Sequence, residues 1–255
     1  MGFFNTLLTQ GQAAGQVTSM NFREDINGLR AIAVVAVVLF HFGVIGFQGG
    51  FVGVDVFFVI SGFLMTYQII GKMENETFSI FHFYAGRARR IVPALLVLCV
   101  VLIIVGWFLL APDAFKALGK HSLSSLLFVS NFAYWQEASY FDEAARSKWL
   151  LHTWSLSVEW QFYIIYPIAI VVMRSLSSLQ YVRIAIVISA LASFAISLIY
   201  SPIYYTATFY LIPFRAWEML GGGDNIPVSN IVNTRPLARN GSTWIAAYLN
   251  ICISV

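Results

Sequence analysis

Long apolar runs alternate with short polar segments along most of the chain. Several runs have about the twenty residues that an α-helix needs to cross the hydrocarbon core of a bilayer. The sequence therefore predicts an all-α fold, a polytopic transmembrane helix bundle of about seven spans. The expected spans are Leu29–Phe47, Phe51–Gly71, Ile91–Ala111, Ser157–Met173, Ile184–Tyr200, Ile203–Gly221 and Trp244–Val255.

One further apolar segment, Ser122–Gln136, is short for a span and contains several serines. The positive-inside rule places the Lys72–Arg90 loop in the cytoplasm, and with it the N-terminus, Arg174 and Arg183. These assignments agree only if an even number of crossings separates Arg90 from Arg174. We therefore expect Ser122–Gln136 to be a re-entrant or interfacial segment.

The two ends of the chain differ from the spans between them. Met1–Ser19 is polar and has no apolar core preceded by positive charge, so we expect a disordered tail and not a signal peptide. Residues 20–255 are expected to form one integral membrane domain. The last apolar run stops within what would be a span, so the domain is expected to be incomplete at its C-terminus.

Composition supports a membrane protein and excludes several functions. Hydrophobic residues make up 59% of the chain and charged residues 11%, about half the charged share of a soluble domain. No phosphate-binding glycine loop is present, and Cys99 and Cys252 have no metal-ligand spacing. We therefore expect no metal site, no tightly bound cofactor and no nucleic-acid partner.

His41 is the first candidate for chemistry, because it lies in a run where an imidazole adds nothing to packing. Asp55 follows across a short glycine-containing turn, and its carboxylate could fix the tautomer of His41. The other ring nitrogen would then be a base for a hydroxyl. An equally good interpretation of Asp55 is an acidic residue at a helix N-terminus.

A second cluster lies at the mouth of the span that begins near Ser157. Ser155, Glu159 and Tyr163 recur every four residues and so share one helix face. A carboxylate with two hydroxyls on one face could hold a sugar or orient a base. Helix capping would explain the serine equally well, but it does not explain the polar residues that continue inward.

Two pairs of charged residues complete the candidates. Arg87 and Arg90 are three residues apart at the start of a span, where they could grip phosphates or simply anchor the helix. Arg215 and Glu218 lie within a span and can pair with each other, which suits either a structural role or substrate binding.

Several of these motifs occur together in an order that resembles the acyltransferase-3 family of bacterial inner-membrane O-acyltransferases. The resemblance covers about Asn21 to Gly222. It rests on Asn27-Gly28-Leu29-Arg30-Ala31, His41, the run from Gly50 to Phe63, Phe83-Tyr84, Arg87, Arg90-Ile91, Pro93, the run from His152 to Glu159, Phe209-Tyr210 and Arg215-Ala216-Trp217-Glu218.

The resemblance implies a multi-pass enzyme of the bacterial inner membrane. Its donor co-substrate would be an acyl-CoA such as acetyl-CoA, and its acceptor a hydroxyl of O-antigen or another surface polysaccharide. It also implies that His41 is catalytic, that Arg87 and Arg90 serve the donor, and that Glu159 is functional. Trp160 departs from the family pattern, which usually has a second glutamate there.

Two other functions fit the same polar residues. A saccharide transporter or flippase would also line a helix bundle with polar groups, but it needs no base within reach of an acceptor. The C-terminus that stops within an apolar run is also what an inactive, truncated remnant would show.

Overall fold

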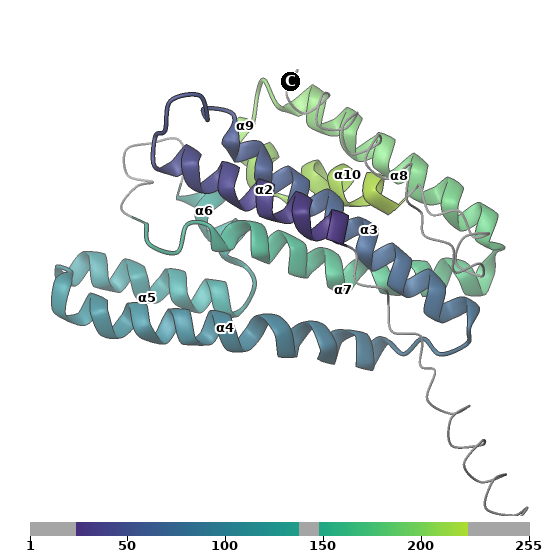
Figure 1. The fold of residues 1–255 in the computed structure, drawn as a ribbon, viewed down its shortest axis with the longest axis horizontal. Coiled ribbons are helices and arrows are strands. Elements are labelled where there is room, and N and C mark those ends of the chain that lie inside the picture. The colour runs from purple at the N-terminus through teal and green to yellow at the C-terminus, as the bar shows by residue number, and fades with distance from the viewer. Residues whose placement is uncertain (1–23, 138–147, 224–255) are drawn as a thin grey trace, which may run out of the picture.

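The structure is a computed structural model that describes residues 24–137 and 148–223 (Figure 1). In this part of the chain all regular structure is helical, which confirms the predicted all-α fold. Besides the short 3-10 turn η1 (Gly50–Val52), the helices are α2 (Glu24–His41), α3 (Gly53–Glu74), α4 (Ile80–Leu109), α5 (Pro112–Leu126), α6 (Ser130–Gln136), α7 (Thr153–Leu176), α8 (Leu179–Tyr200), α9 (Tyr205–Tyr210) and α10 (Ile212–Gly223).

Four helical segments of the described residues are long and apolar enough to cross a membrane, and the chain is a multi-pass membrane protein. They are Gly50–Glu74, Ile80–Leu109, Thr153–Leu176 and Leu179–Tyr200. The ends of α3 and α7 and the starts of α4 and α8 lie at the same end of the bundle (Figure 1). This arrangement brings Lys72, Arg174 and Arg183 to one end, as the positive-inside argument requires.

Two predicted spans differ from the structure. The first helix ends at His41 and not at Phe47, because turns that include Gly43 and Gly46 at positive φ follow it. The predicted span Ile203–Gly221 is wrong, since the chain is extended at Leu211 between α9 and α10. Pro213 explains the restart, because proline is tolerated in the first turn of a helix but not in its interior.

The segment Ser122–Gln136 forms no spanning helix, in agreement with the prediction. α5 doubles back along α4, and the two helices lie side by side (Figure 1). α5 ends at Leu126, Phe128 has a positive φ of 55°, and α6 begins at Ser130. The predicted tail Met1–Ser19 and the last predicted span, Trp244–Val255, lie outside the described residues.

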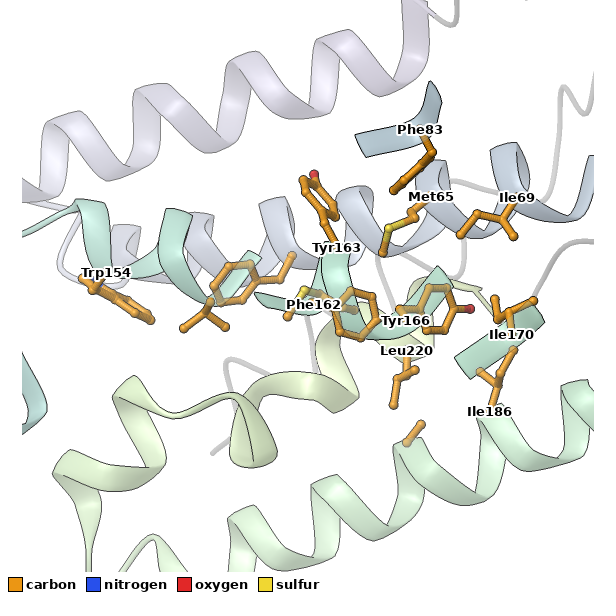
Figure 2. Packing of buried hydrophobic residues seen from close by; sticks show 14 of the residues in the cluster. Met65, Ile69, Phe83, Trp154, Phe162, Tyr163, Tyr166, Ile170, Ile186 and Leu220 are labelled. Atoms are coloured by element: carbon orange, nitrogen blue, oxygen red, sulfur yellow. The ribbon is translucent and has the colours of Figure 1, made fainter. Parts of the chain in front are cut away.

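The core of the bundle is built from the aromatic face of α7. Trp154, Phe162, Tyr163 and Tyr166 are all buried there, and they pack against apolar side chains that include Met65 of α3 (Figure 2). Tyr166 donates to or accepts from the Thr66 hydroxyl at 2.7 Å. Polar atoms on this face are thus bonded within the bundle, as burial requires.

Helix α3 is central because it packs closely against α2 on one side and α10 on another. Its glycines allow this approach. A Cβ atom at Gly62 would meet the Met219 carbonyl oxygen of α10 at 1.8 Å, and one at Gly53 would meet the Ala33 oxygen of α2 at 2.6 Å. Gly50 makes a similar contact with α2. Small residues are what allow membrane helices to pack at this separation.

Replacing Gly62 with alanine is expected to lower the free energy of unfolding by about 3 kcal/mol, because the new methyl group has to push α3 and α10 apart. Gly86→Ala on α4 is the control, since nothing lies within 4 Å of a Cβ there. Thermal unfolding in detergent should show a lower midpoint for Gly62→Ala alone. Equal midpoints for both variants would contradict the close packing.

Candidate active site

His41 is the last residue of α2, and its tautomer is set by the backbone. Its Nδ1 atom lies 2.7 Å from the carbonyl oxygen of Val37. A carbonyl can only accept, so Nδ1 carries a proton, and in the neutral imidazole the lone pair is then on Nε2. The ring also contacts those of Phe40 and His152, with centroid distances of 5.0 and 4.4 Å. The Val37 carbonyl and these two ring contacts thus orient the exposed His41 ring.

The structure corrects the predicted partner of Asp55. Its carboxylate accepts a hydrogen bond from Nη1 of Arg215 at 3.0 Å. The orienting role that the sequence suggested for this carboxylate is filled instead by the Val37 carbonyl. Asp55 is therefore not the residue that sets the tautomer of His41.

The packing of α2 against η1 and α3 explains why His41 and Asp55 do not lie side by side. Gly50 lies against Ala36 and Phe40, which puts His41 level with the start of η1. Asp55 lies about one and a half helical turns further along, or roughly 7 Å along the axis. The connection between the two long helices is longer than the short turn predicted from the sequence, because α2 ends at His41 and η1 precedes α3.

Arg215 joins two carboxylates in a cluster between α3 and α10. It donates to Glu218 at 2.7 Å, which confirms the predicted pairing, and also to Asp55 and to the Phe209 carbonyl oxygen. The Glu218 side chain is only 1% exposed. This geometry favours the structural interpretation of Arg215 and Glu218 over direct substrate binding, because the charges are used to join helices.

Glu159 and Tyr163 share one face of α7, as predicted, and they are bonded to each other. The Tyr163 hydroxyl donates to Oε1 of Glu159, and the hydroxyl of Ser61 on α3 donates to the same oxygen. Ser61 lies within the Gly50–Phe63 motif, but its role could not be predicted from the sequence, because its partner Glu159 is 98 residues away. The three side chains form a polar contact between two spans.

Ser155 does not join this contact. Its hydroxyl donates to the His152 carbonyl oxygen at 3.1 Å, at the first turn of α7. Such a local bond is typical of a serine near a helix end. The bond is not a helix cap, since α7 has no side-chain cap hydrogen bond, and the capping interpretation of Ser155 is not confirmed.

Arg87 and Arg90 differ in their surroundings. The Arg87 guanidinium lies 4.8 Å from the centre of the Tyr163 ring, and its Nη2 donates to the Gln68 side chain at 3.2 Å. Arg90 is exposed. A guanidinium stacked on an aromatic ring keeps a fixed orientation, which suits bidentate recognition of an anion.

A groove of about 500 Å³ lies between α4 and the start of α7. It is lined by Ile91, Ala94, Leu95, Leu98, Trp149, Leu150, His152, Thr153 and Leu156. Burial lowers the pKa of His152, and the neighbouring His41 lowers it further. The role of His152 could not be predicted from its motif, because the contact with His41 joins two segments that are far apart in the sequence.

A charged cluster ties α5 and α6 to the segment before α7. Burial raises the pKa of Glu137, but hydrogen bonds from Lys120, His121 and Lys148 outweigh burial and lower it to about 2. Glu137 is thus ionised at neutral pH. Within residues 24–137 and 148–223, no three acidic, histidine or cysteine side chains come together as a metal site.

The sequence profile of the acyltransferase-3 family, described as an acyltransferase domain, matches residues 23–230. The chain belongs to this family. The match includes every candidate residue described above, from His41 to Glu218. No solved structure matches this acyltransferase-3 member.

Curated relatives of this acyltransferase-3 member include two named O-acetyltransferases. The peptidoglycan O-acetyltransferase OatA of Listeria monocytogenes is 38% identical over 151 residues, which is 58% of this chain and 24% of the relative. The O-acetyltransferase OatA of Staphylococcus aureus is 35% identical over 155 residues, 60% of this chain and 25% of the relative. The chain thus matches about a quarter of the length of either relative.

Proposed function

We propose that this acyltransferase-3 member is an enzyme that moves an acyl group from acyl-CoA to a hydroxyl of a cell-surface carbohydrate. The observation that carries the proposal is the order of groups along α7. Arg87 lies at Tyr163, Glu159 follows one turn away, and His152 with His41 lies at the start of the helix. His152, Glu159 and Tyr163 are seven and four residues apart, so they form a row on one face of α7, with an anion site at one end and a base at the other.

The donor is assigned to the end of this row that carries Arg87. Its guanidinium donates to Gln68 through one nitrogen only, so other N–H groups remain for phosphate oxygens. Arg90 is exposed beside it and can add a second cation. The positive-inside rule puts this end in the cytoplasm, where acyl-CoA is made, and the membrane is then the bacterial inner membrane.

The acceptor hydroxyl is assigned to His41. Nε2 takes the hydroxyl proton while the oxygen forms a bond to the carbonyl carbon of the thioester. The C–S bond then breaks, and the leaving thiolate takes the proton back from His41. Glu159 acts further along the row, where its carboxylate fixes the Tyr163 ring on which Arg87 stacks.

We propose peptidoglycan as the acceptor class, in place of the O-antigen that the sequence suggested. The support is the name of the Listeria relative, which gives peptidoglycan as what that protein acetylates. The names of the Listeria and Staphylococcus relatives give no support to O-antigen or lipopolysaccharide. The acetyl group named for both relatives is likewise the first acyl group to test.

The proposed activity is tested with the purified chain in lipid vesicles, radiolabelled acetyl-CoA and soluble glycan fragments of peptidoglycan. We expect label in the glycan as an alkali-labile ester, with one free CoA released for each ester formed. Label that crosses into the vesicles without any ester would instead indicate a transporter. Intact acetyl-CoA in every condition would contradict the proposal.

A further inference from the structure

The groove between α4 and the start of α7 is much larger than an acetyl group needs. Its volume is about 500 Å³. Pockets of roughly 300–1,000 Å³ hold drug-sized ligands, whereas an acetyl group contributes only a few heavy atoms. A transfer site built for acetyl alone leaves most of this space unused.

The lining of the groove selects an apolar occupant. Six of its side chains are aliphatic, and Trp149 adds an aromatic surface. A sugar placed here would lose hydrogen bonds with water and gain few from the protein, which makes its burial unfavourable. A hydrocarbon chain gains from the same burial, because apolar surface leaves water.

The position of the groove relates it to the reaction. His152 lines the groove, and its ring is in contact with that of His41. In the proposed reaction the thioester carbonyl is attacked beside His41, so the acyl chain attached to that carbonyl extends from this point. The groove is the apolar space that adjoins it.

From these observations we infer that the groove is an acyl-chain site, and that this enzyme accepts acyl groups longer than acetyl. The inference rests on the proposed function and specifies its donor. His152 lies at the reacting end of the chain, Leu156 and Leu95 line its sides, and Ala94 leaves the room that the chain fills.

The first test compares acetyl-, butyryl-, hexanoyl- and dodecanoyl-CoA as donors for the chain in lipid vesicles with peptidoglycan glycan fragments. Each methylene buried in the groove raises kcat/KM by up to about fourfold, which corresponds to about 0.8 kcal/mol. We expect butyryl-CoA to exceed acetyl-CoA by about tenfold, and dodecanoyl-CoA to fall again once the groove is full.

Two variants change the groove in opposite directions. Ala94→Leu occupies it and should abolish the advantage of butyryl- and hexanoyl-CoA over acetyl-CoA. Leu98→Ala enlarges it and should move the optimum to a longer chain. Ala195→Leu is the matched control, because it places the same leucine on an exposed position of α8 and should leave the chain-length profile unchanged.

The outcomes separate this inference from the proposed function. Transfer of acetyl alone, with the same profile in Ala94→Leu as in the unchanged chain, would overturn the acyl-chain site and leave the acyltransferase intact. The groove would then hold a bilayer lipid chain. Absence of transfer from every donor would instead overturn the proposed function itself.

Discussion

Replacing His41 with glutamine is expected to lower kcat for glycan acylation by about 10²–10⁴-fold, the range that one general base contributes. Glutamine keeps a hydrogen-bonding side chain at the end of α2 but cannot take a proton from a hydroxyl. The hydroxyl of a sugar has a pKa far above 7, so its attack on a thioester depends on that proton transfer. Initial rates at saturating acyl-CoA measure the effect.

His82→Gln is the control for this experiment. His82 is an exposed histidine at the start of α4, where it contacts Ser79, and its replacement should leave kcat unchanged. A His41→Gln enzyme with a nearly normal rate would show that His41 only positions the acceptor. Glu159 would then be the next candidate for the base.

Replacing Arg87 with lysine is expected to raise the KM for acyl-CoA by at least about tenfold. Lysine keeps the positive charge but lacks the planar guanidinium group, which can donate two parallel hydrogen bonds to a phosphate. It also stacks less well on the Tyr163 ring. Hydrogen bonds to charged groups contribute about 1.5–3 kcal/mol, so the loss of one is enough for this effect. Titration of acyl-CoA at fixed glycan concentration gives the KM.

Arg89→Lys is the matched control, because Arg89 is an exposed arginine on the same helix. Its KM for acyl-CoA should match that of the unchanged enzyme. If Arg87→Lys also has an unchanged KM, Arg87 serves only to anchor α4 in the bundle, which is the alternative that its sequence position allows.

The sequence was sufficient to predict the helices that form because of their length and apolar composition. The runs that became α3, α4, α7 and α8 are long and apolar, and a helix that satisfies its own backbone is the main solution available to such a run in lipid. The pairing of Arg215 with Glu218 and that of Glu159 with Tyr163 were also predictable, because helix geometry alone brings residues three or four apart together.

Contacts between distant segments were not predictable in the same way. Ser61 meets Glu159, and Asp55 meets Arg215, only because particular faces of α3 turn toward α7 and α10. Spacing within one helix carries no information about that rotation. The expected pairing of His41 with Asp55 failed for this reason, since the end of α2 and the η1 turn decide which residues are level.

The part-buried contact between Asp55 and Arg215 also constrains how the protein is inserted into the membrane as it is made. The two residues are 160 positions apart, so Asp55 leaves the ribosome long before its counter-ion exists. Until α10 arrives, α3 enters the bilayer with an uncompensated acid near its first turn, which is unfavourable in hydrocarbon. Biosynthesis therefore has to keep α3 near water or the insertion machinery until the last described helix closes the bundle.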